Sequence, residues 1–491
     1  MRGFKLYLKT ILLVSFLPTM AIADSEITMK DLSKKINAIA KENKKLRQRL
    51  KKLESSNDEN WSAAYKKSSS KKNLSSSKKS EIVKTNNRYS YEILNPLWDL
   101  ASKPKLILDK KKDGILQEDS VTLSASVFAI ADYQKSNTQD KFGYLMRHPT
   151  GNNQRAKEVS EAVIHSAQLA LTGNLSNWLT AYFEMLYDPQ QSFGAGTITD
   201  LNRNQIQLRR GYVLLGDLNR SPLYLALGKL DTPFGLMDTV NPFTNSTVWH
   251  AFGGLVYGAN AGFSQDGWKF NVMGVQGGAQ FRAANVPVDD SNIPSKLNNY
   301  VLNLSKTLQV GDLFEGMIGA SYIRGSAYCQ NFPVTHFSAC DERNGAYDIY
   351  ARLTADNWLL QGEYAETEDE WPGTFNPTIP QHIASKVSSW SVGGIYGPRI
   401  PSLAKLDFNI SAEFSRFVAG PEGAPWEHQD QLVLGLTSFI VPNAKLFAEY
   451  IRTQGYAPLN FISGGNLGDG VTHSSSSAHS DIFLVGFNAA F

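Results

Sequence analysis

The chain has 491 residues, of which 42% are hydrophobic, and its formal net charge is +3. This length exceeds one ordinary soluble domain, and no run of about 18 apolar residues occurs, which excludes helical membrane spans. The only two cysteines, Cys329 and Cys340, exclude a disulfide scaffold and cysteine-based metal modules. Residues 24–120 hold 23 basic and 14 acidic side chains, whereas residues 121–491 hold 23 basic and 32 acidic ones.

Residues 1–23 have the pattern of a cleavable signal peptide. Arg2, Lys5 and Lys9 precede a short apolar run, and Ala21-Ile22-Ala23 supplies the small residues that signal peptidase accepts. The apolar run is too short to span a bilayer, so we expect an exported protein. An N-terminal helix of the folded core is the alternative.

Residues 24–54 have a heptad pattern whose core positions are Met29, Leu32, Ile36, Ile39, Asn43, Leu46, Leu50 and Leu53. Seven of these eight are apolar, and a 3.5-residue repeat keeps its apolar stripe facing a partner helix. The pattern predicts a short periplasmic coiled coil and a homo-oligomer, in which Asn43 fixes the register. An amphipathic helix that lies on its own domain is the alternative.

Residues 55–120 are predicted to form a Lys/Ser-rich tether and a short periplasmic element. Residues 55–80 are mostly Ser, Lys and Asn, so they cannot bury enough apolar area to offset the entropy of the chain. The lysines have the charge to contact peptidoglycan or lipid headgroups; a solvated linker without a partner is the alternative. Nucleic-acid binding is not expected of an exported protein.

From residue 121 onward the apolar period changes to two, as where Val121 and Leu123 alternate with Thr122 and Ser124. Lipid wets one face of such a strand and the lumen wets the other, and the strands must close because no backbone group can stay unpaired in lipid. Residues 121–491 therefore predict an all-β membrane protein, a 16-stranded antiparallel transmembrane β-barrel in the lipid of a Gram-negative outer membrane. A soluble sandwich or propeller is the alternative.

Short and long connections alternate between the predicted strands, as expected when both ends of the barrel chain lie in the periplasm. The predicted strands lie near residues 121–133, 161–172, 177–188, 204–215, 222–231, 254–264, 267–276, 298–309, 315–325, 345–355, 357–366, 386–397, 404–415, 430–440, 443–453 and 481–491.

The last predicted strand has one apolar face, formed by Phe483, Val485, Phe487 and Phe491. A terminal Phe on an alternating strand resembles the signal that outer-membrane barrels present to the barrel assembly machinery. Cys329 and Cys340 fall in one predicted outer loop, where an oxidising compartment favours a disulfide that staples the loop.

A barrel of sixteen strands leaves an aqueous lumen. The inward charged positions carry both signs, as in a pore whose transverse field orients polar solutes; these candidate pore-lining residues are Glu184, Arg209, Arg324, Asp348, Arg352, Glu363, Glu413 and Glu449. The alternative is that many of them only solvate the wall. The connection from Thr232 to Gly253 is long enough either to fold inward as a constriction or to cap the barrel. Scattered histidines give no hydrolase set, so neither an enzyme nor a metal or cofactor site is predicted.

The whole layout resembles the LbtU-like siderophore porins, which are related to the Fup/Fsl-type outer-membrane iron-uptake proteins of intracellular gammaproteobacteria. The shared pattern is a leader, a heptad region, a Lys/Ser tether and a barrel of this size, with similar phrases at Leu227–Gly235 and in the final strand. The resemblance implies uptake of ferric polycarboxylate siderophore or iron without an energy-coupling plug domain. It assigns no substrate residues.

Two other hypotheses stay open at this point. The second is a general diffusion porin for small hydrophilic solutes, and the third is a structural or adhesive protein anchored to the cell wall. A net-negative barrel attracts an anionic chelate only where basic side chains concentrate locally.

Overall fold

The structure, a computed structural model, describes residues 82–139, 141–143, 156–187, 206–276, 296–311, 314–329, 342–375, 379, 381–397, 407–458 and 472–491. The predicted signal peptide, the heptad helix with its core positions, residues 55–81 of the tether and Cys340 lie outside these residues. The coiled coil, the oligomer that depends on it, the cell-wall contact and the disulfide therefore stay predictions.

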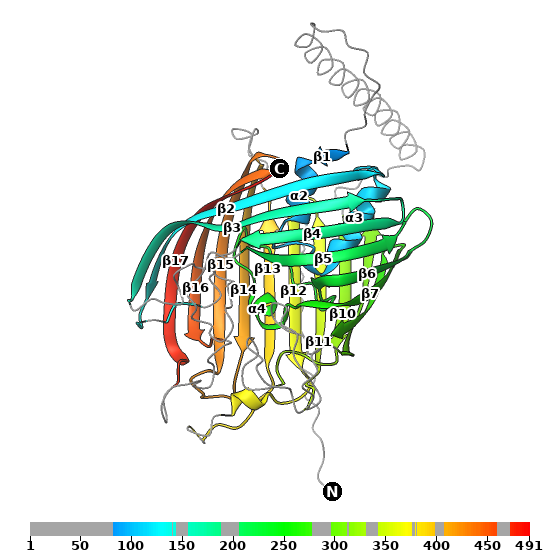
Figure 1. Ribbon diagram of the computed structural model, residues 1–491. Coiled ribbons are helices and arrows are strands. Elements are labelled where there is room, and N and C mark those ends of the chain that lie inside the picture. Colours follow the sequence, from blue (N-terminus) through cyan, green and yellow to red (C-terminus); the bar gives the residue numbers. More distant parts are fainter. Residues whose placement is uncertain are drawn as a thin grey trace, which may run out of the picture. The chain divides into compact units, whose positions relative to one another are not determined.

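Sixteen antiparallel strands close into a barrel (Figure 1). Each strand from β2 onward pairs with the next strand in the chain, and β17 pairs with β2 to complete the cylinder. The strands are β2 (Ser120–Ser136), β3 (Glu158–Asn174), β4 (Leu179–Tyr187), β5 (Ile206–Gly216), β6 (Leu223–Asp231), β7 (Leu255–Gln265), β8 (Trp268–Gln276), β9 (Leu297–Val310), β10 (Phe314–Ile323), β11 (Ala346–Ala355), β12 (Trp358–Thr367), β13 (Ser388–Tyr396), β14 (Asp407–Val418), β15 (His428–Val441), β16 (Ala444–Tyr456) and β17 (Ser475–Ala490). Each predicted strand overlaps one of these, and the predicted barrel is confirmed.

The outward face of the barrel is apolar. On the last strand Phe483, Val485, Phe487 and Phe491 are exposed, whereas the intervening Leu484 and Asn488 are buried inside. Closure pairs the strands all around the cylinder, so an apolar outer surface faces hydrocarbon without unpaired backbone. The chain is therefore an outer-membrane barrel. Recognition of its last strand by the assembly machinery stays a prediction.

The residues before the barrel form short elements: β1 (Val83–Thr85), α2 (Asn87–Ile93), η1 (Leu100–Ser102) and α3 (Lys103–Lys112). The side chain of Asn86 caps α2 by accepting a hydrogen bond from the Tyr89 backbone N–H at 2.9 Å. Two more helical pieces, α4 (Thr247–Phe252) and η3 (Pro372–Thr374), lie in connections between strands. No helix among the described residues is long and apolar enough to cross a membrane.

The strand β1 extends the seam at which β2 meets β17. Phe491 exchanges backbone hydrogen bonds of 2.7 and 2.9 Å with Ala125, and the described chain ends there. Beyond that point β1 pairs in parallel with residues 121–123 of β2. The two segments therefore share one edge of β2, one after the other.

Residues 86–116, which we call the plug, fold inside the barrel. Their apolar side chains are buried against inward-facing residues of β3 to β6; the cluster includes Tyr89, Ile93, Leu94, Ile107, Leu108 and Leu116 of the plug with Ala170, Tyr182, Tyr212, Leu214, Tyr224 and Ala226 of the wall. The sequence had placed this segment in the periplasm. The correction has a physical reason: the apolar side chains lose water by entering the lumen, where an apolar stretch of wall receives them.

Candidate functional site

The plug makes polar contacts with widely separated strands of the wall. On one side, the hydroxyl oxygens of Ser90 and Ser124 (β2) lie 2.8 Å apart. Elsewhere the Arg352 guanidinium of β11 lies 4.3 Å from the centre of the Trp98 ring. Contacts to both β2 and β11 show that the plug reaches across the lumen, at the end of the barrel where β17 ends (Figure 1). The resemblance implied a barrel without an energy-coupling plug domain, and that stays a prediction, because the plug described here is a short segment of residues 86–116.

One buried lysine holds the plug in its compact shape. Lys103 is 1% exposed, and its ammonium group donates to the carbonyl oxygens of Glu92 at 3.0 Å and Asn95 at 2.9 Å. These bonds join the end of α2 to the start of α3. Burial lowers the pKa of Lys103 to about 8, since a charged ammonium loses its hydration in the apolar cluster.

The connection between β6 and β7 folds into the lumen, and we call residues 232–254 the constriction loop. Its backbone begins close to the wall: the Gly235 N–H donates to the Ser321 hydroxyl of β10 at 2.6 Å. Gly235 has φ of +69°, and a Cβ there would lie 2.4 Å from a carboxylate oxygen of Glu363, so only glycine fits. Of the two placements that the sequence left open, the structure has the inward one.

Three glutamates hold the constriction loop against alternate strands. Glu363 (β12) accepts from the backbone N–H groups of Leu236 at 2.6 Å and Met237 at 3.0 Å. Glu413 (β14) accepts from the Val240 N–H and from the side chains of Thr239 and Asn241. Glu449 (β16) accepts from the N–H groups of Phe243 and Thr244 and from the Thr244 hydroxyl. These side chains, predicted as pore-lining, therefore act by positioning the loop that narrows the pore.

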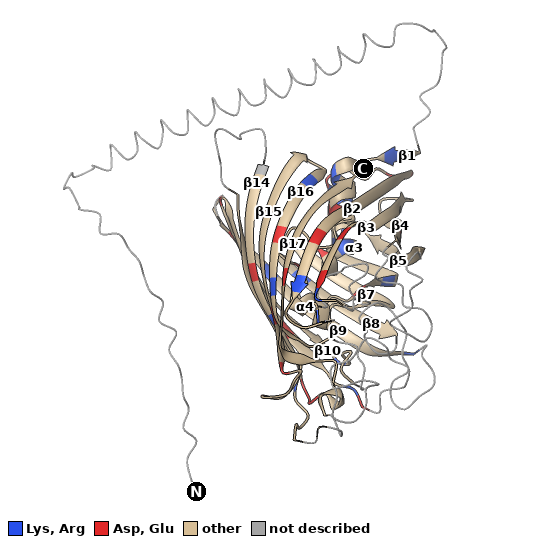
Figure 2. Ribbon diagram, turned by 90° about the vertical axis from the view of Figure 1, so that its left-hand side faces the viewer, with Lys and Arg blue, Asp and Glu red and all other residues tan. Residues whose placement is uncertain are grey.

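Seven of the eight candidate pore-lining residues face the lumen, and charges of both signs lie along the strands (Figure 2). Asp348 and Arg352 point inward from β11, next to Glu363 on β12. The prediction that Arg324 lines the pore is wrong. Arg324 is exposed and has the same outward parity as Ile318, which is 63% exposed. The prediction placed this residue in the wrong phase of the two-residue period of β10.

Glu184 and Arg210 meet inside the barrel together with Arg209, which parity counted from Leu214 would place outside. A bulge in β5 lets Arg210 pair with Glu184 in register while Leu208 pairs with the next residue of β4. Both arginines are then buried, and Arg210 donates to Glu184 at 2.9 Å and to Asp231 at 2.8 Å. An extra residue in one strand is invisible to a strict two-residue period.

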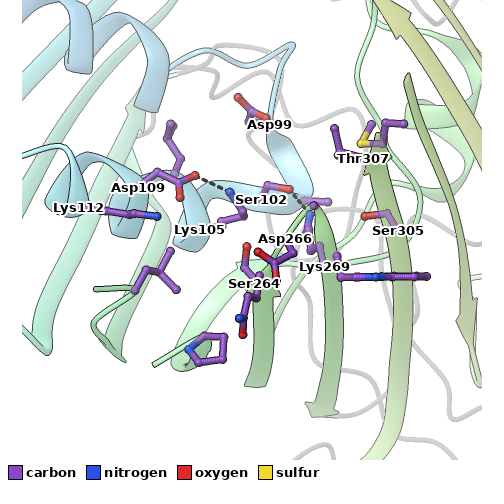
Figure 3. A pocket seen from close by; sticks show the side chains of 18 of the residues that line it. Asp99, Ser102, Lys105, Asp109, Lys112, Ser264, Asp266, Lys269, Ser305 and Thr307 are labelled. Carbon is purple, nitrogen blue, oxygen red and sulfur yellow. Dashed lines mark hydrogen bonds and ion pairs between the residues drawn. The ribbon is translucent and has the colours of Figure 1, made fainter. Parts of the chain in front are cut away.

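A cavity of about 690 Å³, which we call the vestibule, lies between the plug and β7 to β11 (Figure 3). It runs from the periplasmic turns at 218–222 and 264–268 to the constriction loop at Gly235, Leu236 and Asp238. Lys105 and Lys269 line it, together with Asp109, which is bonded to Lys105 at 2.6 Å. The vestibule is therefore a polar chamber with charges of both signs, placed directly below the constriction.

Sequence reasoning missed Trp98, Asp238 and the role of the plug. One signal was available: β4, β5 and β6 carry apolar residues on both faces, with Tyr182, Leu214 and Ala226 pointing inward. A wall that faces water on its lumen side is polar there, so a doubly apolar stretch predicts that something apolar covers it.

Comparison with known proteins gives similarity of fold at low identity. No protein-family model and no curated protein matches the chain. An anion-selective porin from Comamonas acidovorans has 13% identity and a TM-score of 0.45, covering 76% of this chain and 99% of its own. The channel DcaP of Acinetobacter baumannii has 12% identity and a TM-score of 0.44, and the match covers 76% of this chain and 97% of DcaP. OprB of Pseudomonas putida has 10% identity and a TM-score of 0.44, and the match covers 75% of this chain and 94% of OprB. We draw no functional conclusion from these similarities.

Proposed function

We propose that this chain is an uptake porin of the outer membrane, and that its specialised cargo is a ferric siderophore. The observation that carries the porin role is the charged vestibule of about 690 Å³ below an inward-folded constriction loop. Cavities of about 300–1,000 Å³ are typical of sites for small molecules, and a constriction with charges of both signs orients a polar solute.

The ferric siderophore is supported by the resemblance and by the local charge. Five basic side chains and four carboxylates line the vestibule, whereas residues 121–491 hold 23 basic and 32 acidic side chains. The vestibule thus departs from the net negative charge of the barrel, which favours entry of an anionic polycarboxylate chelate. The chelate is cargo, so no residue is proposed to hold iron permanently.

Uptake in cells tests the cargo. A deletion strain should take up ferric siderophore much more slowly than its parent in iron-poor medium, and the gene supplied in trans should restore the rate. Uptake of a neutral sugar of similar size is the control and should change little. Equal loss of both solutes would favour the general diffusion porin, and an unchanged siderophore rate would exclude the specialised cargo.

A further inference from the structure

Arg352 lies on β11 at the inner end of the vestibule, where it is bonded to the constriction loop. Its Nη2 donates to a carboxylate oxygen of Asp238 at 2.6 Å, and Nε and Nη2 donate to the side-chain oxygen of Gln361 at 3.2 and 2.9 Å. Gln361 in turn donates to the backbone oxygen of Asp238 at 2.7 Å. Asp238 is thus held at both its side chain and its backbone.

The tip of the plug meets the loop at the same place. The Trp98 ring lies against the Arg352 guanidinium, and the Thr239 N–H of the loop donates to the Leu97 carbonyl of the plug at 3.2 Å. Burial raises the pKa of Asp238, and the charge of Arg352 opposes this shift. Arg352 is therefore the point at which plug, constriction loop and vestibule come together.

The guanidinium keeps one donor for a further ligand. Arg352 lines the vestibule with 15% of its side chain exposed, and its Nη1 has no hydrogen-bond partner within the described part of the chain. Lys105, paired with Asp109, and Lys269, which donates to the Ser102 hydroxyl, line the same cavity. A planar guanidinium that already binds one carboxylate has the geometry to bind another, and the two ammonium groups add positive charge beside it.

We propose that Arg352 is the centre of a binding site for polycarboxylate anions in the vestibule, in which a solute carboxylate accepts from Nη1 while Asp238 keeps Nη2. Asp238 is the resident carboxylate of the site, and its negative charge opposes that of the solute. This inference rests on the proposed function and names the chemical class that the vestibule selects.

Planar-bilayer recordings of the purified full chain test the site, with citrate added to both chambers in KCl. Citrate should block part of the current of the unaltered protein. Arg352→Gln should raise the half-blocking citrate concentration by roughly tenfold or more, because a hydrogen bond between charged groups is lost. Asp238→Asn keeps the guanidinium and removes the negative charge beside the bound solute, so it should lower that concentration.

Arg324→Gln is the matched control, since it removes an arginine that the structure places on the outer surface, and its citrate block should equal that of the unaltered protein. Equal block in Arg352→Gln and the unaltered protein, or weaker block in Asp238→Asn, would overturn the proposal. Absence of any conductance in the unaltered protein would instead contradict the porin role. Migration in unheated gels reports whether each variant is folded.

Discussion

Deletion of the plug, residues 86–116, should raise the single-channel conductance of the barrel by roughly threefold or more, because conductance follows the open cross-section of a pore. The plug occupies the periplasmic side of the lumen, where its apolar side chains pack against the wall. Bilayer recordings of the deletion variant in KCl measure the effect. Deletion of the predicted heptad segment alone, residues 29–53, is the control and should leave conductance unchanged.

A disulfide between the plug and the barrel wall distinguishes a plug that stays in place from one that moves during conduction. Each buried apolar side chain of the plug contributes about 1.5–3 kcal/mol to its docking, so we expect it to stay in place during conduction. The hydroxyl oxygens of Ser90 and Ser124 are 2.8 Å apart, close enough for a disulfide between cysteines at these positions. The double variant Ser90→Cys/Ser124→Cys should conduct equally before and after reduction.

Two results would contradict this account of the plug. A deletion variant that is folded but conducts like the unaltered protein would mean that the plug does not narrow the pore. A locked variant that conducts only after reduction would mean that the plug must leave its site. The unaltered protein treated with the same reductant controls for any effect at Cys329.

Replacement of the glutamates that hold the constriction loop should have the second-largest effect. In Glu413→Gln/Glu449→Gln each carboxylate loses its charge and presents an amide donor to N–H groups of the loop. Each replacement should weaken loop docking by about 2 kcal/mol, the size of one hydrogen bond to a charged group. We expect roughly doubled conductance and stronger current noise as the loop leaves the wall.

Glu366→Gln is the matched control for this experiment. Glu366 lies three positions from Glu363 on β12 but faces outward, where it accepts a hydrogen bond from Tyr347 at 2.9 Å. Its replacement should change neither conductance nor noise. If the double variant folds and its current trace matches that of the Glu366 variant, the two glutamates do not hold the loop.

The barrel could be predicted from the sequence because strand periodicity is a local property. Alternation along β2 or β17 depends only on which side of each residue meets lipid, so strand positions and most inward residues follow from parity. Parity fails where the backbone gains a residue, as between Leu208 and Arg210. Such an insertion leaves no mark in the residue pattern.

The interior could not be predicted because its contacts are not local. Leu236 meets Glu363 across 127 residues, and Phe243 meets Glu449 across 206. An apolar loop and a row of inward glutamates are both visible in the sequence, but nothing local shows that one binds the other. The plug was missed for the same reason, since its apolar helices have the pattern of any amphipathic segment.

The seam at β2 limits where this chain can be extended. Residues added after Phe491 in the direction of β17 would come opposite Ser124, then Leu123 and the residues before it, and β1 already pairs with residues 121–123. An affinity tag fused there would compete with β1 for the same backbone groups and pull on the strand that leads into the lumen. Purification handles therefore belong at the opposite end of the barrel, such as in the connection that carries η3 (Pro372–Thr374), away from this shared edge.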